Sequence, residues 1–152
     1  MFGKHSEFCH LALLPSYLER NNSSLVYQVD YFIQNSEHLN SAFYLRNHAD
    51  LFDQLQQNEK NQVPSILWGV SFGLLDFIEE YQLPLEYTTV IETGGMKGGV
   101  RNFYVKNYIP DLSSAFSISD VAGEYGMTEL MSQAYAKQKG IYSCPPWISF
   151  NP

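Results

Sequence analysis

Short apolar runs alternate with segments of helical periodicity along most of the chain. The apolar runs predict strands at residues 11–14, 42–45, 65–70, 88–91 and 118–122. The intervening segments carry apolar residues at helical spacing and predict helices at residues 25–33, 51–55, 74–78 and 108–116. Nearly continuous apolar strands are typical of a parallel sheet, because helices cover both of its faces. We therefore expect an α/β fold with a mostly parallel sheet flanked by helices.

Short polar side chains predict where the helices begin, because their oxygens accept hydrogen bonds from the first free amides of a helix. Ser23 or Ser24 is expected to cap the first helix, Asp50 the second and Ser71 the third. Further along the chain we expect a loop at residues 58–62, a helix at 128–136 and one more strand at 148–150.

Length and composition suit one compact unit. The chain has 152 residues, and no linker or low-complexity segment divides it. Both ends lie inside strand-like patterns, so we expect residues 1–152 to be a single α/β domain cut from a longer one. No apolar run reaches the length of a membrane span and no signal peptide is visible, so a cytoplasmic location is expected.

The charge balance narrows the classes of partner. The formal net charge is −7 and no run of Lys or Arg occurs, which argues against nucleic-acid binding. Charged residues make up only 16% of the chain, below the ~25% typical of soluble domains, and aromatic residues are abundant. A non-catalytic nucleotide-binding or protein-interaction module would also have such a surface.

Two polar loops follow predicted strands, where the ligands of parallel sheets bind. Residues 92–99 contain four glycines, which allow close approach of the backbone to a ligand, although a flexible turn explains them equally well. In the second loop, residues 124–129, Thr128 and the helix amides can meet a phosphate, and Glu129 can bind Mg²⁺. The simpler alternative is that Thr128 and Glu129 only begin a helix.

The second loop carries a recognisable motif. Tyr125 to Glu129 matches the Tyr-Gly-x-Thr-Glu motif of the adenylate-forming superfamily. More specifically, the chain resembles the acyl-protein synthetase (LuxE) family, the long-chain-fatty-acid–luciferin-component ligase type. Five blocks carry this resemblance in the same order and spacing, at residues 13–20, 23–27, 92–98, 124–135 and 144–147.

The resemblance implies a fold, an activity and a set of site residues. The fold would be part of the large N-terminal domain of an adenylate-forming enzyme. ATP and a fatty acid would give an acyl-adenylate, whose acyl group moves to a thiol of an acyl-accepting or reductase protein. The implied residues are Gly94, Gly95 and Met96 at the adenine, Tyr125 and Gly126 beside the base, Thr128 as the catalytic phosphate ligand, Glu129 as the catalytic Mg²⁺ ligand, and Pro15, Ser16, Tyr17, Gly69 and Ser71 in the acyl pocket.

The chain departs from the family pattern in several places. The upstream phosphate loop and the C-terminal lid of the family are absent, so we expect the chain alone to be incompetent in adenylation. Gly99 stands where the family usually has Arg, and Gly123 where it usually has Ser. An aryl- or acyl-CoA ligase is a further alternative, because it would share Tyr125 to Glu129. The Gly-Val-Ser stretch at residues 69–71 is not assigned as a nucleophile elbow.

Overall fold

The computed structural model describes residues 3–14, 23–94, 108–125, 133–136 and 142–143, and it confirms the α/β class. The described strands form one sheet in the order β2-β1-β3-β4-β5-β6-β7, in which β1 to β5 are parallel and β6 and β7 antiparallel. The strands are β1 (Cys9–Leu13), β2 (Ala42–Phe43), β3 (Ser65–Gly69), β4 (Thr88–Glu92), β5 (Ala122–Tyr125), β6 (Ala134–Ala136) and β7 (Tyr142–Ser143). The helices are the 3-10 turn η1 (His5–Glu7), α1 (Ser24–Gln34), α2 (His48–Lys60), α3 (Ser71–Glu80) and α4 (Tyr108–Phe116).

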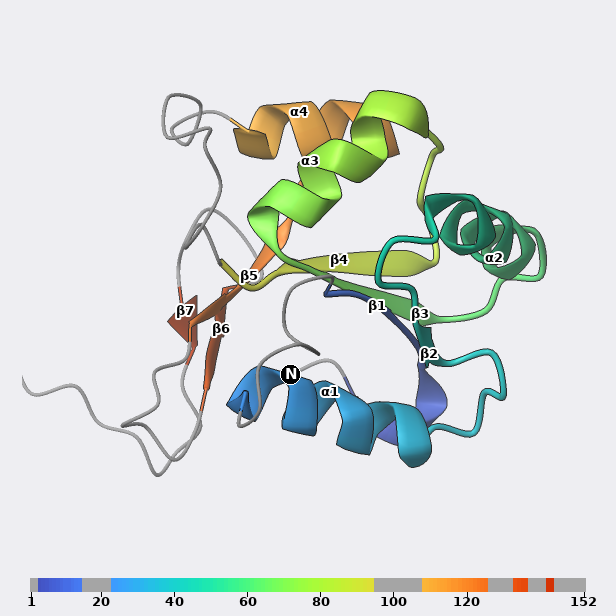
Figure 1. Cartoon of the computed structure of the whole chain (residues 1–152), viewed down its shortest axis with the longest axis vertical. Helices are drawn as coiled ribbons and strands as arrows, with labels where there is room; N and C mark the ends of the chain where they lie inside the picture. The colour runs from blue at the N-terminus through green and yellow to red at the C-terminus, as the bar shows by residue number, and fades with distance from the viewer. Residues whose placement is uncertain (1–2, 15–22, 95–107, 126–132, 137–141, 144–152) are drawn as a thin grey trace, which may run out of the picture.

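The helices divide between the two faces of the sheet. Among the described helices, α1 lies on one face, and α3 and α4 lie on the other (Figure 1). Successive side chains of a strand point to opposite faces. In β3, therefore, Ile66 and Trp68 join the core beneath α1, whereas Leu67 joins the core beneath α2, α3 and α4. Among the described helices, none is long and apolar enough to cross a membrane.

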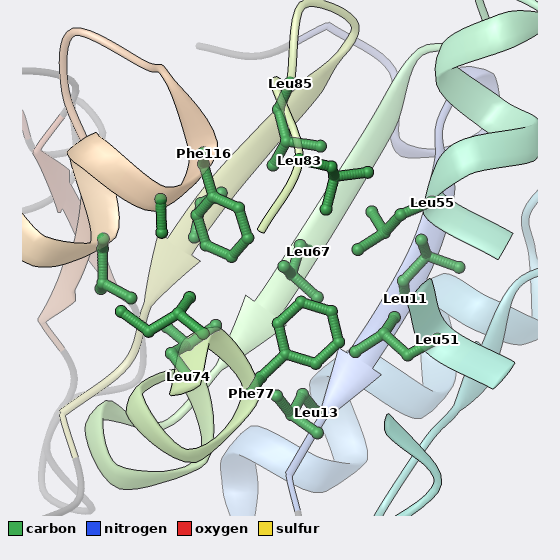
Figure 2. Close-up of a cluster of buried hydrophobic side chains, with 14 of the residues drawn as sticks. Leu11, Leu13, Leu51, Leu55, Leu67, Leu74, Phe77, Leu83, Leu85 and Phe116 are labelled. Atoms are coloured by element: carbon green, nitrogen blue, oxygen red, sulfur yellow. The ribbon is translucent and has the colours of Figure 1, made fainter. Parts of the chain in front are cut away.

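The larger core centres on Phe77 of α3. This side chain is fully buried and lies in the middle of the leucines that β1, β3 and α2 contribute (Figure 2). Its ring centroid lies 6.2 Å from that of Phe116 in α4 and 5.4 Å from that of Tyr81. Phe77 therefore joins the helices of this face to the sheet.

An aromatic stack fills the core beneath α1. The rings of His10, Phe32 and Trp68 stack with centroid separations of 5.4 to 6.2 Å. His10 Nδ1 accepts a hydrogen bond from Trp68 Nε1 at 3.1 Å, and Nε2 lies 2.8 Å from the carbonyl oxygen of His5. These partners require the neutral tautomer with its proton on Nε2. Burial, the main cause, accordingly lowers the pKa of His10.

The helix starts confirm one expected cap and correct two. Ser23 caps α1, and its Oγ accepts from the Val26 amide at 3.3 Å. The prediction for Asp50 was wrong, because α2 begins at His48 and Asp50 lies in its first turn. The prediction for Ser71 was also wrong. Ser71 is the first residue of α3, and its hydroxyl bonds to Glu92 rather than to the helix backbone.

Three predicted element boundaries were also wrong. The expected loop at residues 58–62 is partly helical, because α2 continues to Lys60 while buried Asn58 donates to Ser65 Oγ at 2.9 Å. The fifth strand begins at Ala122, and Ile118 instead lies in the turn that follows α4. Strand β6 occupies the end of the expected helix at 128–136; its start and the expected strand at 148–150 lie outside the described residues.

Candidate functional site

The strand order places a change of winding direction at the carboxyl ends of the central strands. The chain runs from β1 outward to β2 through α1 on one face, and from β3 outward to β4 through α3 on the other. In doubly wound sheets, ligands bind beyond the carboxyl ends of the strands where the winding direction changes. Here that point lies between β1 and β3, directly beside Leu14 and Ser71.

The predicted site segments all leave the sheet at this same edge. Residues 15–17 follow β1, residues 69–71 end β3 and begin α3, residues 94–96 follow β4, and residues 125–129 begin at the end of β5. These four strands are adjacent and parallel. The structure therefore brings together the points from which the segments depart. Pro15, Ser16, Tyr17, Gly95, Met96, Gly126, Thr128 and Glu129 themselves lie outside the described residues.

Gly69 allows α3 to start close to the sheet. A Cβ atom at this position would lie 2.5 Å from the side chain of Leu74, in the first turns of the helix. Such a separation is far below van der Waals contact, so a larger residue would force the Leu74 side chain, or the start of α3 that carries it, to shift. The tight passage from strand to helix places Ser71 at the carboxyl edge, the end of the sheet at which the parallel strands finish.

The passage from β3 to α3 also contains a motif that the sequence interpretation missed. Gly73 completes a Gly-x-Ser-x-Gly pattern around Ser71, between a strand and a helix, which is the setting of a nucleophile elbow. Ser71 has no positive φ, so the tight strand–helix packing at Gly69, rather than strain at Ser71 itself, positions the hydroxyl.

Glu92, at the end of β4, organises the hydrogen bonds of this edge. Its Oε1 accepts from the Ser71 hydroxyl at 2.5 Å and from the Gly94 amide at 2.7 Å. The Tyr108 hydroxyl at the start of α4 lies 3.5 Å from Ser71 Oγ. Burial, as the main cause, raises the pKa of Tyr108, which keeps its hydroxyl protonated. One carboxylate thus joins the starts of α3 and of the glycine-rich segment.

Gly94 is placed by its own conformation as well as by Glu92. Its φ is +71°, in the left-handed region that glycine adopts without strain. Its carbonyl oxygen accepts from the Ser71 amide at 3.3 Å, and no atom lies within 4 Å of where a Cβ would be. The hydrogen bond from the Ser71 amide therefore holds the start of the expected adenine loop against α3. The space where a side chain of residue 94 would lie is open.

A second carboxyl group lies on the neighbouring strand. Burial first, and the charge of Glu92 second, raise the pKa of Glu124 to about 7. Glu124 is directly opposite Tyr135 in the antiparallel pairing of β5 and β6. Burial also raises the pKa of Tyr135 to about 12, and its hydroxyl accepts from Gln28 Nε2 at 2.8 Å. The first residue of the predicted phosphate loop, Glu124, thus carries a carboxyl group that is partly protonated near neutral pH.

Gly123 lies against a side chain of β7. A Cβ atom at this position would lie 2.9 Å from the hydroxyl of Tyr142. The serine that the resembling family usually has here would collide with that hydroxyl unless Tyr142 moved. The tyrosine hydroxyl therefore occupies this space in the present chain.

Sequence reasoning missed the roles of Glu92, Tyr108 and Glu124. Glu92 and Glu124 are the first residues of the two expected loops, so their positions after apolar strands were a usable signal. Among the described residues, no group of three His, Cys, Asp or Glu side chains could hold a metal ion. Glu129, the expected Mg²⁺ ligand, lies outside them.

Comparison with known proteins does not identify a family for this chain. No family model matches it, no curated protein matches it and no solved structure matches it. The function therefore has to be argued from the residues and their geometry alone.

Proposed function

We propose that this chain carries the nucleotide- and acyl-binding part of an ATP-dependent ligase that activates a fatty acid as its acyl-adenylate. The activated acyl group would then pass to a thiol of an acyl-accepting or reductase protein. The observation that carries the proposal is the common edge: the segments of the Tyr-Gly-x-Thr-Glu motif, the glycine-rich loop and the expected acyl pocket depart from adjacent parallel strands.

The chemistry of adenylation suits this arrangement. Charge builds on the α-phosphate and pyrophosphate during the reaction, and fixed donors stabilise it. Mg²⁺ would supply further charge neutralisation when bound. In this proposal Gly94, Gly95 and Met96 line the adenine, Thr128 holds phosphate oxygens and Glu129 holds the metal. Glu92 fixes the start of the adenine loop through the Gly94 amide.

Calorimetric titration tests the proposal through binding. The ligand is a non-hydrolysable acyl-sulfamoyl-adenosine, titrated with Mg²⁺ into the chain and into a variant with Thr128→Val and Glu129→Gln. Loss of one fixed donor costs about 2.7–4 kcal/mol in a transition state, and about 1.5–3 kcal/mol is typical for a hydrogen bond to a charged group. We therefore expect the double variant to bind at least ~10-fold more weakly.

A matched control keeps the result specific. Thr93→Val removes a hydroxyl that donates to the Gly69 carbonyl at 3.3 Å, and it should leave the affinity unchanged. Equal binding by the wild type and the Thr128/Glu129 variant, or no binding by either, would contradict the proposed site. Binding of the nucleotide moiety with no contribution from the acyl chain would instead favour a non-catalytic nucleotide-binding module.

A further inference from the structure

Ser71 holds a hydroxyl against a carboxylate at the carboxyl edge of the sheet. Its Oγ donates to Glu92 Oε1 at 2.5 Å, and the Gly94 amide holds the same oxygen at 2.7 Å. A carboxylate within hydrogen-bond reach can take the proton of a hydroxyl that attacks a carbonyl carbon. The contact therefore has the geometry of a nucleophile and its general base.

Helix α3 presents hydrogen-bond donors beside the same hydroxyl. Val70, which precedes the helix, has no side-chain capping bond. The amides of Phe72 and Gly73 in the first turn have no hydrogen-bond partner within the described part of the chain. Free amides at the start of a helix stabilise a negative oxygen, such as that of a tetrahedral intermediate. Ser71 is buried, with 1% of its surface exposed, so an acyl carbonyl would have to displace neighbouring atoms to lie beside these donors.

The surrounding chain supports this assignment. Ser71 occupies the centre of a Gly-x-Ser-x-Gly pattern between β3 and α3, and it lies at the point where the winding of the sheet changes direction. All four histidines are among the described residues, and none of them hydrogen-bonds to Ser71. The role of the base therefore falls to Glu92.

We propose that Ser71 accepts an acyl group from an activated acyl donor, with Glu92 as the general base. In this step a bond forms between Ser71 Oγ and the acyl carbon, and the bond from that carbon to the leaving oxygen breaks. The Ser71 proton passes to Glu92, and the electron pair departs with the leaving group. The product is an acyl ester of Ser71. The biological donor would be the acyl-adenylate, so the inference rests on the proposed function for its donor alone.

An activated ester tests the step without ATP. The chain is incubated with p-nitrophenyl decanoate, nitrophenolate release is followed by absorbance, and the acylated peptide is identified by mass spectrometry. We expect one decanoyl group on the peptide that contains Ser71, and no such group in Ser71→Ala. Glu92→Gln should lower the rate of acylation about 100-fold, the smaller end of what a general base contributes.

Two controls separate the reaction from a structural role. Thr93→Val alters a neighbouring hydroxyl that donates to a carbonyl, so it should be acylated at the wild-type rate. Ser71→Cys keeps a nucleophile in place and should be acylated at least as fast as the wild type. Each variant is checked by circular dichroism for a retained fold.

The outcomes are decisive in both directions. Acylation that persists unchanged in Ser71→Ala, or a folded wild type that takes up no decanoyl group, overturns the inference. The proposed function can fail separately, because it is tested by binding of the adenylate analogue and this reaction contains no nucleotide.

Discussion

Two glutamates, Glu59 of α2 and Glu92 of β4, make similar hydrogen bonds at the two ends of β4. Glu59, in the last turn of α2, accepts from the hydroxyl of Thr88 at 2.7 Å and from the amides of Glu86 and Tyr87 at the start of the strand. Glu92, the last residue of the strand, likewise accepts from one hydroxyl and from a backbone amide. Both carboxylates tie a helix to the sheet.

The two ends differ in what lies beyond them. At the amino edge, Glu59 bonds the end of α2 to the residues that lead into β4. The chain has no glycine-rich segment at this edge. At the carboxyl edge, Glu92 lies beside the uncapped start of α3 and near a second carboxyl group, Glu124. The same bonding pattern therefore supports stability at one edge and a candidate site at the other, as expected for parallel sheets.

The largest expected difference is electrostatic and involves Glu124. Its pKa rises from 4.5 to about 7 on folding, so between these values the folded state binds a proton that the unfolded state has released. Stability is therefore lost as pH rises from 4.5 to 7, by at most about 3 kcal/mol. Glu124→Gln should remove this loss and be more stable than the wild type at pH 8, measured by urea unfolding. An identical pH profile in both proteins would remove this contrast between the edges.

A smaller effect is expected from Gly69→Ala at the carboxyl end of β3. The added Cβ would meet Leu74, and overpacking of this kind costs typically about 1–3 kcal/mol. Because Leu74 and the start of α3 pack against this position, acylation of Ser71 should slow as well. The matched change at the amino end of the same strand is Ser65→Ala, which removes bonds to Asn58 and Val63. It should lower unfolding free energy without changing the acylation rate, and the comparison fails if the two variants slow acylation equally.

The smallest expected effect belongs to Glu59→Gln. Gln has a single accepting oxygen, which can take the bonds from the strand amides, while its NH2 group would have to donate to Thr88 Oγ1; the charge that strengthens the native bonds is lost. Part of this cluster is exposed, so we expect a loss of about 0.5–1 kcal/mol in thermal or urea unfolding. Glu92→Gln, the equivalent change at the other edge, should affect acylation far more than stability. A large acylation defect in Glu59→Gln would show that the two edges are not independent.

The fold class and most elements could be predicted from the sequence, because apolar periodicity is a local signal. The boundaries that failed depend on distant partners. Asn58 continues α2 because its amide bonds to Ser65, which only the folded sheet brings near. The strand order is also a tertiary property, since the apolar runs of β1 to β5 do not reveal which strands are neighbours.

The candidate site was predictable only in outline. Loops that follow parallel strands meet at one edge, so the common location of Gly94 and Tyr125 could be expected. The bond between Ser71 and Glu92 could not, because it joins residues 21 positions apart through the packing of α3 on the sheet. Gly73, in contrast, was readable, and with it the pattern around Ser71.

The stacked ring of His10 gives the molecule a second acid–base sensitivity, opposite in sign to that of Glu124. Protonation would place a proton on Nδ1, against the indole N–H of Trp68, and would break that hydrogen bond, whereas Nε2 could still donate to the His5 carbonyl oxygen. Since burial lowers the pKa of His10, its contribution to stability falls as pH drops below about 6.5, the value for a free histidine. The indole of Trp68, one residue before the end of β3, is therefore a built-in optical reporter of acid loosening in the core beneath α1.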